Sequence, residues 1–319
     1  MTRRELDAAG ITDPPLRQAY SRCRELNAAH GRTYFLATRL LPPDRRPAVH
    51  ALYGFARYVD DLVDLPETEA TPETVRARIA TAEGQLADGL ARGDSDVPVV
   101  AAAVHTARRY GIDPALFSAF LASMRMDLEI RDYPTRTELR RYTYGSAQVI
   151  GLQLLPVLGT VTDPAEAAPY AAALGDAFQL TNFLRDIAED LDRGRIYLPA
   201  DELAVFGVDR ERLTHCRAHG RADAAVRAAI ADQIARTRAV YATAAAGVEL
   251  LSPWSRPCVA TAFTLYSGIL DRIAAMDHDV FAARATVGAG RKLRVAVPAL
   301  ARAWWIRRHV PSATGQLTG

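Results

Sequence analysis

The chain has little lysine, little cysteine and few aromatic residues for its 319 residues. Lys292 is the only lysine, although lysine and arginine together number 39. Nearly all basic residues are therefore arginines, and beside so much alanine this indicates a coding bias rather than a binding surface. The formal net charge is only +2, which gives no electrostatic case for a nucleic-acid partner.

The cysteines and the apolar runs exclude several further classes of protein. The three cysteines, Cys23, Cys216 and Cys258, show no metal-ligand spacing and form no even disulfide set, so free thiols in a reducing compartment are expected. The charged stretch 1–10 lacks the apolar core of a signal peptide. No uncharged apolar run approaches the roughly 18 residues of a transmembrane helix. We therefore expect a cytoplasmic protein.

Helical periodicity runs through nearly the whole chain, and strand-like alternation is nearly absent. Helices are predicted at 14–29, 45–64, 72–91, 97–110, 114–130, 137–158, 164–192, 222–250, 256–284 and 291–308. Several of these begin with a capping residue before a proline, at Asp13, Thr71, Asp113 and Asp163. No Gly/Ser-rich or Pro-rich linker interrupts the pattern. We predict a single all-α domain over 1–310, followed by a disordered tail at 311–319.

Two acidic helical motifs that resemble each other lie far apart in the sequence. They cover 57–64 and 182–190. Each places two aspartates four residues apart, with apolar residues between them and an arginine just before them. Positions i and i+4 of a helix are neighbours on one face, roughly 5–6 Å apart. The irregular stretch 193–207, with two glycines and a proline, follows the second motif directly and is placed to fold over whatever that motif binds.

The position of the carboxylates within these helices points to metal and phosphate. A single acidic pair on a helix is most often solvated surface. Here, however, both pairs lie at the edge of the apolar face, and the two motifs together hold Asp60, Asp61, Asp64, Asp186, Glu189, Asp190 and Asp192. Such a cluster near a core repels itself unless cations are present. Mg²⁺ uses few carboxylates and completes its shell with phosphate oxygens, and the arginines Arg57 and Arg185 suit the remaining phosphate oxygens.

The chain resembles the squalene/phytoene synthase family of head-to-head prenyltransferases over roughly 15–295. The shared blocks are 30–35, 53–64, 126–128, 142–147 with Gly151, and 179–199. The last block, which ends in Arg-Ile-Tyr-Leu-Pro at 195–199, is the most specific. Within the family the chain is most similar to bacterial, especially actinobacterial, members that make phytoene.

This resemblance implies a fold, a cofactor and a set of site residues. The fold would be the isoprenoid synthase helical bundle around a central cavity. Mg²⁺, or Mn²⁺ in its place, would be held by Asp60, Asp61, Asp64, Asp186, Glu189 and Asp190. Three tyrosines would lie beside the phosphates and the reacting carbons, namely Tyr53, Tyr142 and Tyr266. The remaining substrate-binding residues would be His30, Arg32, Thr33, Arg57, Asp127, Ala147, Gly151, Gln179, Asn182 and Arg185.

The reaction implied by the resemblance joins two geranylgeranyl diphosphates to phytoene through a cyclopropyl diphosphate, without NADPH. Two alternatives keep the same scaffold: fifteen-carbon donors that give dehydrosqualene or squalene, and a terpene-cyclase-like reaction of one diphosphate. A silent prenyl-lipid-binding subunit would require broken acidic motifs, and both motifs are intact. Ser146 has no matching histidine and acid, which argues against a serine hydrolase, and His215 with His219 lacks the carboxylate of a zinc-protease motif.

A few residues leave specific questions open. Gln148 stands where many relatives have a small residue, so a side chain pointing into the cavity would put the donor length in doubt. Asp127 is expected either in a structural salt bridge, with Arg125 or Arg131, or on the lining of the site. Trp304 and Trp305 among arginines suit either a helix docked on the bundle or contact with the inner face of an anionic membrane. A monomer or weak homodimer is expected.

Overall fold

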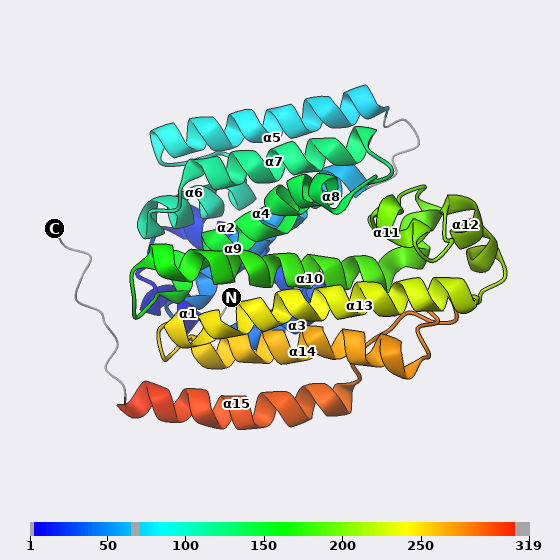
Figure 1. Cartoon of the computed structure of the whole chain (residues 1–319). Helices are drawn as coiled ribbons and strands as arrows, with labels where there is room; N and C mark the ends of the chain where they lie inside the picture. The colour runs from blue at the N-terminus through cyan, green and yellow to red at the C-terminus, as the bar shows by residue number, and fades with distance from the viewer. Residues whose placement is uncertain (1–2, 65–70, 310–319) are drawn as a thin grey trace.

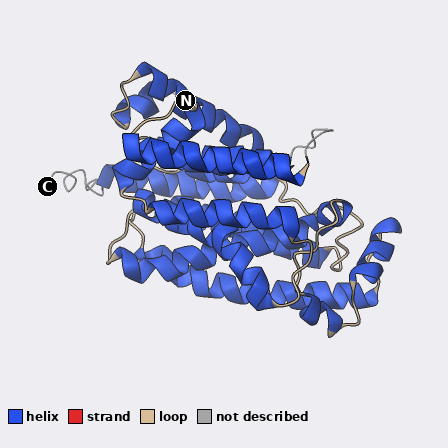
Figure 2. Cartoon of the chain, turned by 90° about the horizontal axis from the view of Figure 1, so that it is seen from above, coloured by secondary structure: helices blue, strands red, loops and turns tan. Residues whose placement is uncertain are grey.

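The computed structural model describes residues 3–64 and 71–309, and over these residues the chain is helical with two isolated β-bridges and no strand (Figures 1 and 2). In chain order the elements are α1 (Arg3–Ala8), α2 (Pro14–His30), α3 (Arg32–Thr38), α4 (Arg46–Asp64), α5 (Pro72–Arg92), α6 (Pro98–Tyr110), α7 (Pro114–Glu129), α8 (Arg136–Thr143), the π-helical turn η1 (Tyr144–Gln148), α9 (Val149–Leu158), α10 (Pro164–Asp192), α11 (Ala200–Ala204), α12 (Arg210–Ala218), α13 (Ala224–Ala245), the 3-10 turn η2 (Ala246–Leu250), α14 (Arg256–Ala275) and α15 (Ala289–His309). The predicted all-α fold class is confirmed.

The capping residues that the sequence places before four helices form hydrogen bonds to the first turn of each helix. A backbone N–H in the first turn of α2, α5, α7 and α10 donates to the side chain of Asp13, Thr71, Asp113 and Asp163, respectively. These bonds satisfy donors that have no partner inside the helix. The predicted tail at 311–319 and residues 65–70 lie outside the described residues.

Three predicted helices differ from the structure. The helix expected at 222–250 begins at Ala224 and gives way to the 3-10 turn η2 after Ala245. The helix expected at 137–158 contains the π-helical turn η1, where the hydrogen-bond register changes. The helix expected at 256–284 ends at Ala275. Asp277 and His278 adopt φ values of 55° and 59°, which a right-handed helix does not allow.

Two large buried clusters form the core on either side of the molecule. The first gathers residues from α1, α2, α4, α5, α6, α7 and α9. The second gathers residues from α8, α10, α11, α12, α13 and α14, with the segment 196–198. In Figure 1, α10 crosses the middle of the bundle, with α13 and α14 on one side of it and α9, α7 and α5 towards the other. The first acidic motif is thus on a helix of one cluster, and the second is on a helix of the other.

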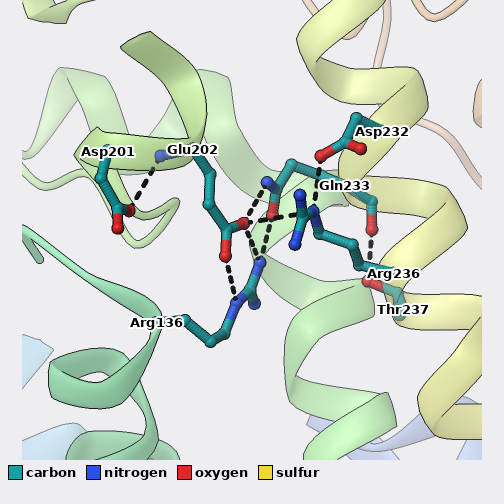
Figure 3. Close-up of polar contacts among 7 residues, drawn as sticks. All are labelled: Arg136, Asp201, Glu202, Asp232, Gln233, Arg236 and Thr237. Carbon is teal, nitrogen blue, oxygen red and sulfur yellow. Dashed lines mark hydrogen bonds and ion pairs between the residues drawn. The ribbon is translucent and has the colours of Figure 1, made fainter. Parts of the chain in front are cut away.

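The irregular stretch after the second motif is tied down by polar contacts. Glu202 of α11 accepts hydrogen bonds from Arg136 at 2.5 and 3.1 Å and from Gln233 at 2.6 Å, as Figure 3 shows. Burial would raise the pKa of Glu202, but the hydrogen bonds from Arg136 and Gln233 lower it below its usual range. The hydrophobic side chains of 196–198 are buried in the second core cluster. This stretch therefore packs as a fixed wall behind the second motif.

Candidate active site

A cavity of about 310 Å³ lies between α3, α4, α9, α10 and α14. Along α10 its lining runs from Ala167 to Asn182, a rise of about 22 Å at 1.5 Å per residue. Most of the other lining residues are alanine, leucine, isoleucine and valine, many of them from α3, α4, α9 and α14. We call this cavity the slot. Its length and its apolar walls suit an extended hydrocarbon tail.

Polar side chains gather at one end of the slot. Tyr53 of α4 lines it from one wall, and Gln179 and Asn182 of α10 line it from the other. Asn182 Nδ2 donates to Gln179 Oε1 at 3.3 Å, whereas Asn182 Oδ1 is buried without a hydrogen-bond partner. The next turn of each helix carries its acidic motif. The polar end therefore presents an acceptor that a ligand or an ion would satisfy.

An aromatic patch joins the two walls at this end. Tyr34 of α3 stacks on Tyr266 of α14, with ring centroids 4.8 Å apart, and its centroid lies 6.3 Å from that of Tyr53. Phe178 of α10 completes the patch, 4.5 Å from Tyr266. Burial raises the pKa of Tyr53 to about 12 and that of Tyr34 well above its usual value. These rings stay neutral, so their faces are available to a cation.

The first motif is organised around Arg57. Its Nη1 lies 3.2 Å from Asp60 Oδ2, and its Nη2 pairs with Asp61 Oδ1. Arg57 Nε is buried and has no hydrogen-bond partner. The backbone of Asp64 belongs to α4, but its side chain lies outside the described residues. One guanidinium thus holds two carboxylates and keeps one N–H unused.

The second motif is organised around Asp186. Arg185 donates to both oxygens of this carboxylate, at 2.8 and 2.5 Å. Burial by itself would lower the pKa of Arg185, but the pairing with Asp186 raises it overall. Arg284, from the segment after α14, lies 2.7 Å from Asp186 and 3.3 Å from Glu189. Burial and the neighbouring Asp186 raise the pKa of Asp190 to about 7.

The donor chemistry of the motifs fits a hard divalent cation. Carboxylate oxygens are the ligands that Mg²⁺ prefers, and burial followed by the neighbouring Asp186 raises the pKa of Asp190, so a nearby cation would stabilise its charged form. Within the described part of the chain, however, no three His, Cys, Asp or Glu side chains converge closely enough to hold a metal. Mg²⁺ in proteins often uses one or two carboxylates and takes its other ligands from water and phosphate.

Asp127 lies in a buried network beside the second motif. Its oxygens accept hydrogen bonds from Tyr142 at 2.8 Å and from Tyr197 at 2.9 Å. The rings of Tyr142 and Tyr197 stack, with centroids 5.4 Å apart. Arg125, one expected partner of Asp127, pairs with Glu83 instead. Neither Asp127 nor Tyr142 lines the slot, so both lie behind its wall.

The remaining expected residues divide between the slot and its mouth. Ala147 of η1 and Gly151 of α9 line the slot. A Cβ at Gly151 would lie 2.2 Å from the carbonyl oxygen of Ala171 in α10, so only glycine permits this approach of the two helices. His30 and Arg32 are exposed and Thr33 is half-buried at the junction of α2 and α3.

The side chain of Gln148 does not enter the slot. It lines a separate polar depression on the other side of α10, together with Arg140 and Asp176. Ser146 and Ala147 line the slot, and Ile150 and Gly151 follow them at a spacing of four, so Gln148 lies on another face of the helix. The doubt that Gln148 raised about donor length is therefore removed.

Sequence reasoning missed several residues of this region. Tyr34 and Ser146 line the slot although only their sequence blocks were recognised, and the buried Oγ of Ser146 has no hydrogen-bond partner. Arg284 carried no local signal, because its partner Asp186 lies 98 residues away.

Comparison with known proteins agrees with this geometry. Residues 27–291 match the family described as squalene/phytoene synthase. The chain is 38% identical to a phytoene synthase of Arthrospira platensis over 86% of its own length and 90% of the relative's. It is also 38% identical to the 15-cis-phytoene synthase of Synechocystis, over 86% and 82% of the two lengths.

Solved structures show the same architecture. A dehydrosqualene synthase with a bound ligand superposes with a TM-score of 0.80 at 26% identity, covering 92% of this chain and 98% of the other. A squalene synthase of Alicyclobacillus acidocaldarius gives a TM-score of 0.74 at 26% identity, covering 85% and 98%. Family match, curated relatives and fold agree, and the chain belongs to the squalene/phytoene synthase family.

Proposed function

We propose that the chain joins two geranylgeranyl diphosphates head to head to form phytoene, an early step of carotenoid biosynthesis. Curated phytoene synthases at 36–39% identity over most of the chain support this. The observation that carries the proposal is the shared polar end of the slot. Two helices from different core clusters, α4 and α10, both line one apolar slot and both carry an acidic motif on the turn that follows the lining.

The apolar lining and the polar end of the slot would bind different parts of the substrate. Enzymes of this family use prenyl diphosphates and generally depend on a divalent metal. Burying a tail of about 20 carbons at ~0.8 kcal/mol per carbon gives on the order of 10 kcal/mol of gross affinity. The apolar lining can thus hold the tails, and the arginines can concentrate on the diphosphates. We propose Arg57 and Arg185 for this role, because Arg57 keeps an unused buried N–H.

Mg²⁺ is the proposed cofactor, with Mn²⁺ as an alternative ion. The side chains that would hold it are those of Asp60, Asp61, Asp64, Asp186, Glu189 and Asp190. When bound, the ion would neutralise charge on the departing diphosphate. Phytoene formation needs no reduction, so NADPH is not expected.

The aromatic patch suits the cationic part of the reaction. Loss of diphosphate from one substrate leaves an allylic cation, the double bond of the second substrate attacks it, and loss of a proton closes a cyclopropane ring. The resulting cyclopropyl diphosphate ionises again, rearranges and loses a proton. Tyr34 and Tyr53 line the slot, Tyr266 stacks on Tyr34 behind them, and neutral aromatic faces stabilise cations. The slot also offers little water to quench the cation.

A second candidate reaction uses fifteen-carbon donors on the same scaffold. It is favoured by the solved dehydrosqualene and squalene synthases, which share the fold over most of this chain. The higher identity to phytoene synthases favours the twenty-carbon donor. We further propose a monomer or weak homodimer that works in the cytoplasm or at the inner face of the membrane.

The test is turnover of labelled geranylgeranyl diphosphate and farnesyl diphosphate with Mg²⁺, with the hydrocarbon identified by mass. We expect phytoene from the wild type and no product from Asp60→Asn or Asp186→Asn. Asp271→Asn is a matched control, because it breaks exposed ion pairs with Arg238 and Arg291 away from the slot. Full turnover by both motif variants would refute the proposal, and preference for the shorter donor would favour the second candidate.

A further inference from the structure

Helix α15 lies along the outer edge of the bundle beside α14 (Figure 1). One face of it is docked on the protein, through the buried residues Ala296, Ala303 and Ile306. Arginines also bind both ends of the helix to the rest of the protein. Arg291 lies 2.9 Å from Asp271 of α14, and Arg307 donates to the carbonyl oxygen of Leu40 at 3.5 Å. Thus α15 is a fixed part of the surface.

A separate face of α15 presents large hydrophobic side chains to solvent. Leu293, Val297, Leu300 and Trp304 follow helical spacing and are 65%, 53%, 45% and 53% exposed. With Trp305, they make up five of the eight exposed large hydrophobic residues in the described part of the chain. Hydrophobic residues exposed singly need no explanation, but a contiguous stripe indicates an interaction site. We call this stripe the α15 stripe.

The positive charge of α15 indicates which kind of partner binds the α15 stripe. The helix contains six basic residues, Arg291, Lys292, Arg294, Arg302, Arg307 and Arg308, and no acidic residue follows Asp279 in the whole sequence. The guanidinium of Arg308 lies over the ring of Trp304 at 3.8 Å. An apolar stripe with tryptophan, flanked only by cations, is complementary to the headgroup region of an anionic bilayer. No described helix is long and apolar enough to cross a membrane, so the contact would be with one surface.

The stripe lies next to the wall of the slot. Ala37, Leu41, Cys258 and Ala262 line the slot, and the same four residues form a buried cluster with Ala303 of α15. Only one layer of side chains from α3 and α14 therefore separates the slot from α15 along this cluster. A surface that held the stripe would lie directly outside the apolar part of the slot.

We propose that α15 docks the protein on an anionic lipid bilayer, with the α15 stripe in the interface and the flanking arginines among the headgroups. The slot wall formed by α3 and α14 then faces the membrane. If the proposed function holds, this arrangement brings the lipophilic substrate tails and the hydrocarbon product close to the bilayer. The docking itself does not depend on the reaction.

The test measures binding of the full chain to vesicles in the absence of substrate, so that it stands apart from catalysis. Vesicles of phosphatidylcholine with about one third phosphatidylglycerol are compared with pure phosphatidylcholine by co-sedimentation. The stripe variant is Leu300→Ser with Trp304→Ser, and its control is Val161→Ser with Val205→Ser, two exposed apolar residues elsewhere. The charge variant is Arg294→Gln with Arg308→Gln, and its control is Arg140→Gln with Arg221→Gln, two exposed arginines outside α15.

We expect binding to anionic vesicles, a loss of at least about tenfold in the stripe variant and a loss of about thirtyfold in the charge variant. Both controls should bind as the wild type does. Tryptophan emission should shift to the blue on binding, and brominated lipid should quench it, because two of the three tryptophans lie on α15. Equal binding by the stripe variant and the wild type, or no binding at all, would overturn the proposal. A stripe that instead mediates a dimer, seen by light scattering without lipid, would overturn it as well.

Discussion

Arg284 contacts Asp186 from a segment 98 residues further along the chain, and its Nε donates to Asp186 Oδ1 at 2.8 Å. The same guanidinium lies 3.3 Å from Glu189. Both carboxylates belong to the second acidic motif. A divalent cation would compete with Arg284 for these oxygens, so the arginine acts as an internal counter-ion of the motif.

Replacing Arg284 with glutamine should therefore strengthen metal binding. The side chain is half exposed, so the ion pair contributes at most about 1 kcal/mol, and the apparent affinity for Mg²⁺ should rise by up to about fivefold. The measurement is a Mg²⁺ titration followed by calorimetry in the presence of a non-reactive diphosphate. Arg238→Gln, which breaks an exposed pair with Asp271, should leave the affinity unchanged. Weaker Mg²⁺ binding by Arg284→Gln would show that the arginine assists the metal rather than replaces it.

Gln148 should have no influence on donor length, because its side chain lines the depression on the far side of α10. We expect Gln148→Ala to keep the wild-type ratio of turnover with twenty-carbon and fifteen-carbon donors. Ala262→Phe is the contrasting variant, because Ala262 lines the slot and a phenyl ring there takes up space needed by the tail. It should shift the ratio towards the shorter donor. If Gln148→Ala changed this turnover ratio in the same competition assay, the side chain of Gln148 would have to reach the slot.

Gly151→Ala should destabilise the contact between α9 and α10. The added methyl would lie 2.2 Å from the carbonyl oxygen of Ala171, and helix backbones must move to relieve such overlap. The expected loss is about 1–3 kcal/mol in the free energy of unfolding, measured with urea. Gly84→Ala in α5 is the control, because a Cβ there meets no atom within 4 Å. It should gain about 0.5–1 kcal/mol from reduced backbone freedom. Equal effects of the two substitutions would show that the close approach is not rigid.

His50 should make folding stability depend on pH. It is buried and its Nδ1 lies 3.0 Å from Asn27 Nδ2. Burial lowers its pKa to about 3, whereas an unfolded chain has a histidine pKa of about 6.5. Between these values the unfolded state binds a proton that the folded state does not, so stability rises with pH across this window and levels off above about 6.5.

The contribution of His50 is isolated by substitution. The slope is up to about 1.4 kcal/mol per pH unit, and His50→Gln should remove it. Urea unfolding at pH 5, 6 and 7 measures the difference between variant and wild type, which should narrow as the pH falls. His219→Gln, at an exposed histidine, should leave the slope as it is. A constant difference between His50→Gln and the wild type at all three pH values would mean that folding does not change the pKa of His50.

Local chemistry explains how much of the fold and site could be predicted from the sequence. Helix starts at Asp13 and Asp163 depend on bonds between residues two or three positions apart, and the sequence displays such pairs directly. The two acidic motifs can be recognised in the sequence for the same reason, because an i, i+4 spacing by itself defines one face of a helix. The family resemblance then supplied the expected roles of residues such as Gln179 and Asn182, and both line the slot.

Tertiary structure alone decided the contacts between distant segments. The stacking of Tyr34 on Tyr266, the pairing of Tyr197 with Asp127 and the contact of Arg284 with Asp186 each join residues at least 70 positions apart. No local periodicity encodes such pairs, because they form only when helices pack. The direction of Gln148 was hidden for a different reason: helical spacing fixes which residues share a face, but only the packing of η1 and α9 against α10 decides which face lines the slot.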